Sequence, residues 1–228
     1  MNFRKAIPTD SAEIKSFTAD TFPWGDYLPN EIDEWIREGN AYVMEDNGRI
    51  LAVASLLILF QGTAWFRGLR VRREERRRGI GRAITSNMIE TAKKMGARRA
   101  MLMVAEWNDA SRSLVTSMGF RPVMNLWGGD VTANAARVGD DEIKDYVRDA
   151  LTATGGYLCL PDDPWTCTKA SIEDALSLAP PVYRGPGIGI GRFSVGSPTA
   201  GVDASVVATK DGDFKNRYGM YTMFELDI

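Results

Sequence analysis

The sequence predicts an α+β fold with a central mixed, mostly antiparallel sheet flanked by helices. Residues 41–71 hold three strand-like segments separated by turn signals, which is typical of an antiparallel meander. Residues 72–119 then alternate between helical and strand patterns. From about Trp127 the chain changes to short strands, helices and glycine-rich stretches. We therefore predict a first domain over residues 1–126 and a smaller α+β unit over residues 127–228.

The first forty residues predict one strand and two helices. Residues 3–7 have a short strand pattern, and Pro8-Thr9-Asp10 starts a helix. Residues 22–29 form a loop rich in aromatic side chains, which suits either a hydrophobic contact between elements or the wall of a substrate pocket. Asn30 is expected to cap a second helix that ends at Gly39.

The predicted meander follows directly. Residues 41–44 and 50–60 flank Asp46-Asn47-Gly48, which is a strong hairpin signal. Gln61-Gly62 turns the chain into a third strand over residues 63–71. This strand leads into a stretch crowded with arginine and glycine.

A helix and a strand come after that stretch. The helix ends at Gly96 and is predicted by apolar side chains four residues apart, which are Ile80, Ile84, Met88 and Ala92. Residues 100–105 are continuously apolar, so they predict a buried strand. This strand should run parallel to residues 63–71, because a helix connects the two. Asn108 or Asp109 is expected to cap the next helix.

The second unit is predicted to begin with a break in the chain at Gly128-Gly129-Asp130. Helices are expected over residues 140–151 and 170–178, with a short strand over residues 157–160. Asp211-Gly212 indicates a hairpin turn near the end of the chain.

A glycine cluster over residues 185–191 superficially resembles a phosphate-binding loop. Pro186 removes one backbone donor, and no strand–helix pattern surrounds the cluster. A bulged strand or a tight loop is therefore favoured.

Composition excludes several classes of protein. The formal net charge is −2, whereas nucleic-acid-binding domains are usually basic, so no nucleic-acid partner is expected. The chain has no histidine and two cysteines without metal-ligand spacing, so we expect no metal site and consider a disulfide framework improbable. The longest apolar run, over residues 50–60, is too short to span a bilayer. We expect a soluble, cytoplasmic protein with no membrane partner and without a signal peptide.

The stretch from Val71 to Gly81 is the main candidate for ligand binding. It joins a strand to a helix, and the amide groups at such a helix start attract anions. Gly79 and Gly81 lack a Cβ atom, so a bulky anion can approach the main chain. A pyrophosphate is the predicted ligand, and an arginine-rich solvated turn is the alternative. A P-loop is excluded because no Gly-Lys-[Ser/Thr] sequence closes the loop.

The spacing Arg76-x-x-Gly79-x-Gly81 resembles the acetyl-CoA signature of the GNAT acetyltransferase superfamily. The segment Asn108-x-x-Ser111-x-x-Leu114-x-x-x-x-Gly119-Phe120 is similar to a second motif of this superfamily. The resemblance covers about residues 3–123 and implies a GNAT fold that binds acetyl-CoA. The residues that it places at the coenzyme are Leu69, Arg70, Val71, Arg76, Arg77, Arg78, Gly79, Ile80, Gly81, Arg82, Asn108 and Ser111.

The resemblance implies a role for each part of this set. Amides from Arg76 to Gly81 would hold the pyrophosphate, and the backbone of Leu69, Arg70 and Val71 would bind the pantetheine like an added strand. The 3′-phosphate would be held by members of an arginine pool, which consists of Arg72, Arg73, Arg77, Arg78 and Arg82.

Two further segments are similar to the histidine N-acetyltransferase-like group of the superfamily. They are Gly25-Asp26-Tyr27-Leu28-Pro29, followed by Trp35, and Gly68-Leu69-Arg70-Val71. Proteins of this group also carry a C-terminal extension. The likeness implies a small amine as the acetyl acceptor, such as the α-amino group of an amino acid.

The catalytic groups are less well defined than the coenzyme site. Many superfamily members place a tyrosine acid where this chain has Val115, which cannot donate a proton. Residues 63–71 also lack the carboxylate that some members use as a base. Glu106 is the first candidate for the base, and a solvated carboxylate is its alternative role. Asp26 and Tyr27 come next, and Tyr218, Tyr221 and Glu225 in the tail are further candidates.

The combined expectation is an N-acetyltransferase that moves an acetyl group from acetyl-CoA to a small-molecule or amino-acid amine by direct attack in a ternary complex. A protein or peptide N-acetyltransferase is the first alternative. A regulatory module that binds acyl-CoA without turnover is the second, because of Val115 and the absence of an evident base. The sequence leaves a homodimer open.

Overall fold

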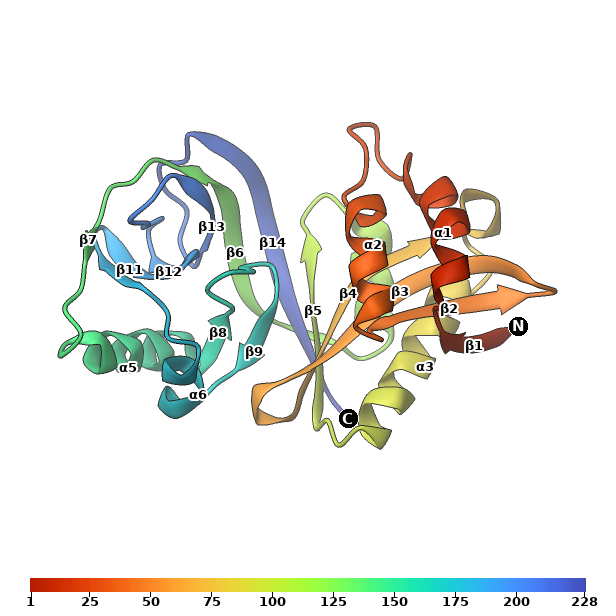
Figure 1. Cartoon of the computed structure of the whole chain (residues 1–228), viewed down its shortest axis with the longest axis horizontal. Helices are drawn as coiled ribbons and strands as arrows, with labels where there is room; N and C mark the ends of the chain where they lie inside the picture. Colours follow the sequence, from red (N-terminus) through yellow and green to blue (C-terminus); the bar gives the residue numbers. More distant parts are fainter. The chain divides into compact units, whose positions relative to one another are not determined.

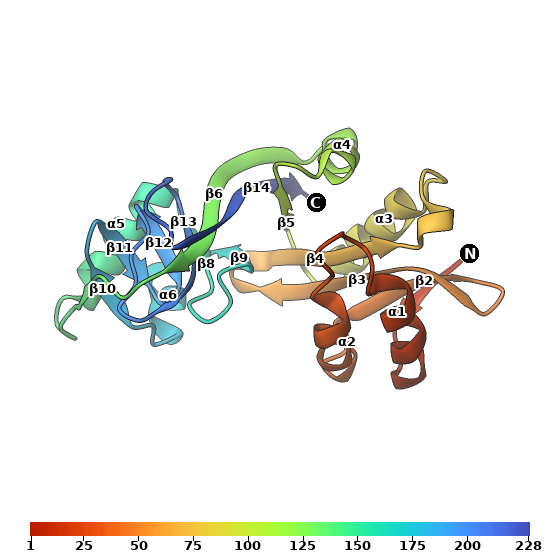
Figure 2. The same ribbon diagram turned by 90° about the horizontal axis from the view of Figure 1, so that it is seen from above.

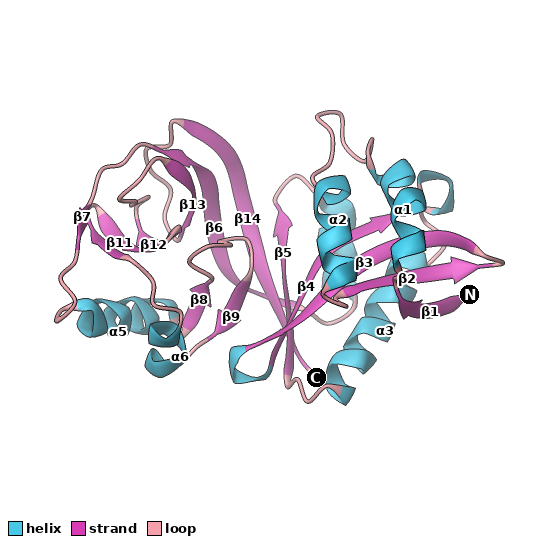
Figure 3. Ribbon diagram, in the orientation of Figure 1, coloured by secondary structure: helices cyan, strands magenta, loops and turns pink.

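The computed structural model describes residues 1–228, which divide into two compact units (Figure 1). Unit 1 comprises Met1–Ile58, Ala64–Ala100 and Ile228, and unit 2 comprises Leu59–Thr63 and Met101–Asp227. Each unit mixes helices with mostly antiparallel strands (Figure 3), which confirms the predicted α+β class. The predicted domain boundary between residues 126 and 127 falls inside one strand of unit 2.

Unit 1 has the order of elements that the sequence predicts. Its strands are β1 (Asn2–Lys5), β2 (Ala41–Asp46), β3 (Arg49–Leu59) and β4 (Thr63–Val71), and β5 (Arg99–Ala105) continues into unit 2. Its helices are η1 (Pro8–Asp10), α1 (Ser11–Thr18), α2 (Leu28–Arg37), η3 (Arg73–Glu75) and α3 (Ile80–Lys94). The short helix η2 (Phe60–Gly62) connects β3 to β4.

The strands of unit 1 form a meander covered on both faces. β2 pairs antiparallel with β1 and β3, and Asn47 and Gly48 make the predicted turn with positive φ values of 50° and 76°. α1 and α2 lie on one side of β2–β4, and α3 lies on the other (Figure 2). The core between α2 and the strands contains Ile32, Trp35, Val43 and Val53. Burial of such side chains is the main stabilising contribution to this unit.

Helix α2 begins earlier than the sequence indicates. Asn30 is not its cap, because the helix starts at Leu28 with Tyr27 in the N-cap position and Pro29 in the first turn. Proline is favourable there, since its missing N–H needs no partner in the first turn. The Leu28 N–H donates to Asp26 Oδ1 at 3.1 Å, which satisfies one donor of the helix start.

Unit 2 contains nine further strands and three further helices. The helices are α4 (Asp109–Ser117), α5 (Ile143–Thr154) and α6 (Ile172–Ser177). The strands are β6 (Arg121–Val131), β7 (Ala136–Arg137), β8 (Tyr157–Cys159), β9 (Cys167–Lys169), β10 (Val182–Arg184), β11 (Gly187–Ile190), β12 (Phe193–Gly196), β13 (Ala204–Ala208) and β14 (Asn216–Asp227). Most of β5 also belongs to this unit. β8 and β9 form a separate two-stranded sheet.

The predicted break at Gly128-Gly129-Asp130 is wrong, because β6 runs through it without interruption. The two glycines instead make room for aromatic rings. A Cβ atom on Gly128 would lie 2.4 Å from the Trp165 ring, and one on Gly129 would lie 2.5 Å from the Phe214 ring. Glycine inside a strand often marks such a close approach.

The predicted hairpin at Asp211-Gly212 is also wrong. β13 and β14, which flank this segment, do not pair with each other, because each pairs antiparallel with β6. The sheet order is β5-β14-β6-β13-β12-β11-β10-β7 in this unit, and β12 and β13 form a parallel pair. The local turn signal did not reveal that β6, from eighty residues earlier, lies between these strands.

Two other expectations for unit 2 have opposite outcomes. Cys159 and Cys167 are directly opposed on β8 and β9 and form a disulfide, so the expectation against a disulfide is wrong. The glycine cluster over residues 185–191 forms the β10–β11 hairpin, as expected for a strand or tight loop. A Cβ atom on Gly187 would lie 2.6 Å from the Ser197 carbonyl oxygen, so the packing requires glycine there.

None of the helices is long and apolar enough to cross a lipid bilayer.

Gly68 in β4 combines two constraints on the residue type. Its φ of +67° is rarely adopted by residues that carry a side chain. A Cβ atom there would lie 2.5 Å from Cζ3 of Trp35, which is almost fully buried. Trp35 therefore packs against the backbone of β4 because position 68 is glycine.

Replacing Gly68 by alanine should lower the free energy of unfolding by about 2–4 kcal/mol, since it adds overpacking to backbone strain. Gly96→Ala is the matched control, because Gly96 also has positive φ (+84°) but has open space around its Cβ position. Gly96→Ala should lower the free energy of unfolding by only about 1 kcal/mol. Urea titrations measure this free energy for both variants, and equal losses would show that the Trp35 contact is unimportant.

Candidate functional site

The turn between β4 and α3 presents the start of a long helix to solvent. After η3 the chain takes a positive φ at Arg77 (+62°) and at Gly79 (+80°), and α3 begins at Ile80 without a side-chain cap. The first backbone bond of this helix runs from the Ala83 N–H to the Gly79 carbonyl at 3.0 Å. The amides of the preceding turn are thus outside the helical ladder, and the helix dipole adds positive potential to them.

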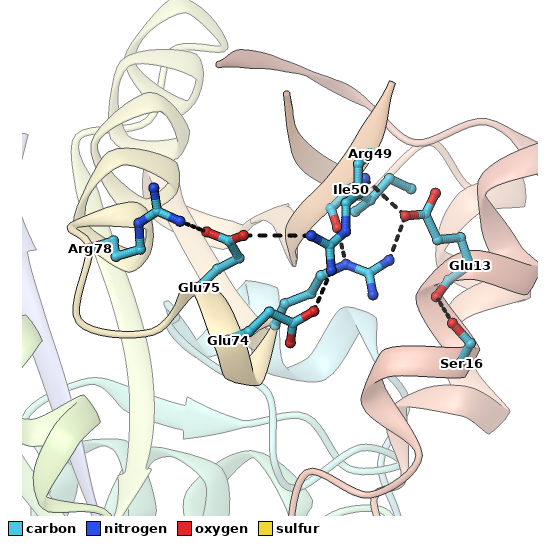
Figure 4. Close-up of polar contacts among 8 residues, drawn as sticks. Glu13, Ser16, Arg49, Ile50, Glu74, Glu75 and Arg78 are labelled. Carbon is cyan, nitrogen blue, oxygen red and sulfur yellow. Dashed lines mark hydrogen bonds and ion pairs between the residues drawn. The ribbon is translucent and has the colours of Figure 1, made fainter. Parts of the chain in front are cut away.

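Two glutamates of η3 organise part of the arginine cluster (Figure 4). Glu75 accepts from Arg78 at 2.5 Å and lies 3.6 Å from Arg49, which also pairs with Glu74. Such solvent-exposed pairs contribute little to stability. Their effect here is geometric, since Glu75 fixes the position of the Arg78 guanidinium.

Arg72 has a structural role that removes it from the pool of phosphate-binding candidates. Its Nε donates to the Ile50 carbonyl and its Nη2 donates to Glu13, both at 2.5 Å. Glu13 also accepts the Ile50 N–H at 3.0 Å, as Figure 4 shows. The guanidinium lies 4.5 Å from the Phe17 ring centroid. These contacts tie α1 to β3.

The remaining arginines fit an anionic ligand. Arg73 and Arg77 are exposed, and their side chains make no ion pair within the chain. A Cβ atom on Gly79 would meet nothing within 4 Å, so the turn is open on that side. Open amides, a helix start and uncommitted guanidinium groups suit a pyrophosphate with a nearby phosphate. The residues present therefore fit the polyphosphate part of a coenzyme A molecule.

The carbonyl groups at the end of β4 are partly occupied. Arg70 Nη1 donates to the Leu69 carbonyl at 3.1 Å, and Arg76 Nε donates to the Val71 carbonyl at 3.2 Å. A carbonyl oxygen has two lone pairs, so a single side-chain donor does not saturate it.

Arg70 and Asp26 form a buried ion pair between β4 and the aromatic loop. Arg70 Nε donates to Oδ2 at 2.5 Å and Nη2 donates to Oδ1 at 2.9 Å, which is a bidentate arrangement. The Asp26 side chain is fully buried. The rings of Phe22 and Tyr27 lie 5.0 and 5.4 Å from the guanidinium. The pair joins the loop that the sequence singled out to the strand that follows it by about forty residues.

The charge state of Asp26 follows from this pair. Burial by itself would raise the pKa of Asp26, but the hydrogen bonds and positive charge of Arg70 outweigh it, so the pKa lies below its ordinary value. The carboxylate is ionised and saturated with donors. A carboxylate of such low pKa is a weak proton acceptor, so its geometry favours positioning over general-base chemistry.

Trp35 and Tyr27 complete this side of unit 1. Tyr27 is half exposed and meets Trp35 edge-on, with ring centroids 6.3 Å apart. The Arg67 guanidinium lies 4.4 Å from the Trp35 ring centroid. The two sequence segments with likeness to the histidine N-acetyltransferase-like group are therefore in direct contact in the folded unit.

The other proposed catalytic position lies in unit 2. Glu106 follows β5 and is exposed, and its backbone N–H donates to the Met220 carbonyl at 2.9 Å. Val115, which stands where related proteins place a tyrosine, is buried in α4 at 4% exposure. A hydrophobic packing role explains valine at that position.

Asn108 acts as the N-cap of α4, which settles the choice between it and Asp109. Its Oδ1 accepts the Ser111 N–H at 3.1 Å, so the first two residues of the second motif take part in one helix cap. This hydrogen bond gives the motif a structural role beside the coenzyme contact that the resemblance implies.

Glu225 in the tail has a structural environment. It is buried at 5% exposure and accepts from Arg121 at 3.1 Å and from the Tyr157 hydroxyl at 3.0 Å. The pattern of the sequence offers no signal for this contact, because Tyr157 and Glu225 are far apart in the chain.

Arg70→Met should lower the free energy of unfolding by about 3–5 kcal/mol at neutral pH, because it leaves a buried carboxylate unpaired. Because the pKa of Asp26 is lowered in the folded state, its pairing stabilises the protein above the ordinary pKa of aspartate, and this stabilisation is lost as pH falls through the folded-state pKa. The difference in free energy of unfolding between the variant and the natural protein should therefore become smaller below about pH 4. Denaturant titrations at several pH values measure it.

Arg37→Met is the matched control, since Arg37 makes an exposed pair with Glu34 within α2. It should change stability by less than about 1 kcal/mol at every pH. A pH-independent loss in Arg70→Met would argue that packing of the side chain, rather than its charge, carries the effect.

Comparison with known proteins finds a family model that matches a little under half of the chain. Residues 11–120 match the model of the "Acetyltransferase (GNAT) family". Over the full length of both chains, the fold is similar to that of a candidate acetyltransferase from Thermoplasma acidophilum, with a TM-score of 0.67 and 17% identity. This likeness concerns the fold alone, and it extends over unit 2 as well as unit 1.

A curated relative adds a local similarity. Histidine N-acetyltransferase from Scomber australasicus is 31% identical over 83 residues, which is 35% of this chain and 25% of the relative. The match thus spans about a quarter of the relative's length. The predicted fold is confirmed, and residues 11–120 are similar to the domain that the GNAT family model describes.

Proposed function

We propose that this protein transfers the acetyl group of acetyl-CoA to an amine of a small molecule or an amino acid. The observation that carries the proposal is the uncapped start of α3, where Gly79 has positive φ and open space beside it. Arg73 and Arg77 are exposed near this helix start, which suits a ligand with several phosphate groups. The family match supports acetyl-CoA as that ligand.

Each part of the coenzyme has candidate partners in this chain. Amides from Arg77 to Gly81 would hold the pyrophosphate, because the Arg76 N–H already donates to the Arg73 carbonyl at 3.4 Å. Arg73, Arg77 or Arg82 would pair with the 3′-phosphate. The Leu69 and Val71 carbonyls, each of which accepts one arginine donor, would also accept from the pantetheine amides. Acetyl-CoA supplies an activated acetyl thioester. The role of the chain is to orient it and to manage the proton of the amine.

The acceptor amine must lose a proton before its nitrogen can attack, because an ammonium has no free electron pair. Glu106 is the proposed base, since it is an exposed carboxylate at the end of the strand next to α4. Tyr27 would contact the acceptor from the aromatic loop. Asp26 would position Arg70 and the loop through the ion pair described above. A backbone N–H near Val71 would polarise the acetyl carbonyl.

The local similarity to a histidine N-acetyltransferase supports an amino-acid amine as acceptor. The sequence segments that resemble the histidine N-acetyltransferase-like group meet around Arg70 and Trp35. One of these segments contains Tyr27, whose exposed part is suited to a contact with a small acceptor.

A non-catalytic module that binds acyl-CoA is the second candidate. The burial of Val115 favours it, because α4 offers no hydroxyl acid at that position. A thiol has a pKa of about 8.5, so coenzyme A can leave as a thiolate without a proton donor. The missing acid therefore does not by itself abolish turnover.

Release of free thiol from acetyl-CoA tests the proposal. The purified protein would be assayed with a panel of amino acids, small polyamines and peptides, and products would be identified by mass spectrometry. Release that depends on a small amine supports the proposed function. Release with peptides alone supports a peptide N-acetyltransferase. Tight binding of acetyl-CoA with no release for any acceptor would support the binding module and overturn the proposal.

Gly81→Leu should raise the dissociation constant for coenzyme A at least about tenfold, because a branched side chain enters the first turn of α3 where the pyrophosphate would lie. Asn87→Leu, on the exposed part of the same helix, is the control and should leave binding unchanged. Calorimetric titration with coenzyme A measures both constants. An unchanged constant in Gly81→Leu would remove the helix start as the binding site.

Glu106→Gln should lower kcat/KM by roughly a hundredfold near neutral pH, where the acceptor is mostly protonated. The loss should shrink above the pKa of the acceptor amine, because the free amine then needs no base. Asp109→Asn, a neighbouring exposed carboxylate, is the control. A loss that is the same at all pH values would exclude Glu106 as the base.

A further inference from the structure

Asp130 in unit 2 is the centre of a second cluster of polar and aromatic side chains. On β6 it is directly opposed by Ser205 of β13 and by Asn216 of β14. Directly opposed residues of antiparallel strands project from the same face of the sheet. Ser205 Oγ donates to Asp130 Oδ1 at 2.7 Å, and Asn216 Nδ2 donates to Oδ2 at 3.0 Å.

A bulge in β14 brings a tyrosine to the same carboxylate. Arg217 is opposite Gly129 and Gly219 is opposite Gly128, so Tyr218 is an extra residue without a partner on β6. Bulges turn the side chain of the inserted residue away from its regular direction and are frequent beside binding sites. The Tyr218 hydroxyl donates to Asp130 Oδ1, and 42% of this tyrosine is exposed.

Two more rings border this tyrosine. Trp165 lies over Gly128 and contacts Tyr221 edge-on, with centroids 4.9 Å apart, and its centroid is 6.3 Å from that of Tyr218. The backbone N–H of Trp165 donates to Asp163 Oδ1 at 3.3 Å, and the Cys159–Cys167 disulfide joins β8 and β9 on either side of the loop that carries Trp165. The loop therefore holds Trp165 in place, and the glycine in β6 makes room for it.

The charge of Asp130 is not neutralised by an ion pair within the chain. Its three hydrogen bonds, from Ser205, Tyr218 and Asn216 in order of effect, lower the pKa of Asp130 to about 2, so it is ionised under ordinary conditions. Lys215 is near enough to contribute to this effect but makes no ion pair with it. A carboxylate has about four acceptor sites, and three are occupied, so Oδ2 retains one.

We propose that Asp130, Tyr218, Tyr221 and Trp165 form a binding site for an organic cation that carries a quaternary or alkylated ammonium group. The faces of tryptophan and tyrosine rings attract cations, and a carboxylate adds a full negative charge to them. A divalent metal is a poorer candidate, because it needs several oxygen ligands and the cluster offers one carboxylate. The proposal concerns unit 2 alone and does not rest on the acetyltransferase function.

Choline and its uncharged isostere 3,3-dimethylbutan-1-ol distinguish a cation site from a general aromatic surface. Each would be titrated into the full-length protein labelled with ¹⁵N, and the indole N–H signal of Trp165, assigned through Trp165→Phe, would be followed. A shift of this signal at millimolar choline, with binding of the isostere at least about tenfold weaker, is expected. Equal shifts with both compounds, or no shift with choline, would overturn the proposal.

Variants of the cluster provide an independent test. Asp130→Asn keeps the shape and removes the charge, so choline affinity should fall about tenfold or more. Tyr218→Leu removes a ring and should weaken binding as well. Asp213→Asn is the control, since it makes the same charge change at an exposed carboxylate that precedes β14, and it should have no effect. Circular dichroism checks that each variant is folded.

Equal loss of affinity in Asp130→Asn and Asp213→Asn would show that general electrostatics, rather than this cluster, attracts the cation. If Asp130→Asn fails to fold, Trp165→Phe together with the choline and isostere pair on the natural protein still decides the question. Unchanged choline affinity in a folded Tyr218→Leu variant would likewise contradict the proposed site.

Discussion

The buried ion pair between Arg70 and Asp26 positions the aromatic loop, the start of α2 and the end of β4 relative to one another. It fixes the aromatic loop against β4, and Asp26 also accepts the first N–H of α2. Arg70 in turn donates to the Leu69 carbonyl of its own strand. One pair thus defines the start of a helix, the position of a loop and part of the hydrogen-bonding capacity of the strand proposed to bind pantetheine. Removing either partner would leave a buried charge without compensation.

The arginines of the turn between β4 and α3 have different roles, and only the folded chain shows which role each has. Arg72 connects α1 to β3, and Arg78 and Arg49 pair with glutamates of η3. Arg73 and Arg77 remain exposed without ion pairs. Sequence spacing treats these side chains as equivalent, because they share a charge and a segment. Their environments separate structural arginines from those available to a ligand.

Glycine has a different structural role in unit 2 from the one that it has at the proposed coenzyme site. At Gly79 the absence of a side chain permits a positive φ at an open helix start, whereas at Gly128 and Gly129 it admits the rings of Trp165 and Phe214. These rings come from segments that are distant in sequence. Gly-Gly-Asp therefore has the local pattern of a turn, although tertiary packing makes it the middle of a strand.

The sequence by itself determined the α+β class, the meander, the start of α3 and the family motifs, because these depend on short-range patterns of apolar side chains, turns and glycine. Tertiary structure decided the rest. The pairing of β6 with both β13 and β14, the disulfide between β8 and β9, and the Asp26–Arg70 contact each join segments without a shared local pattern. Only the packed chain brings such partners within hydrogen-bonding distance, and it also sets the charge state of the carboxylates at both sites.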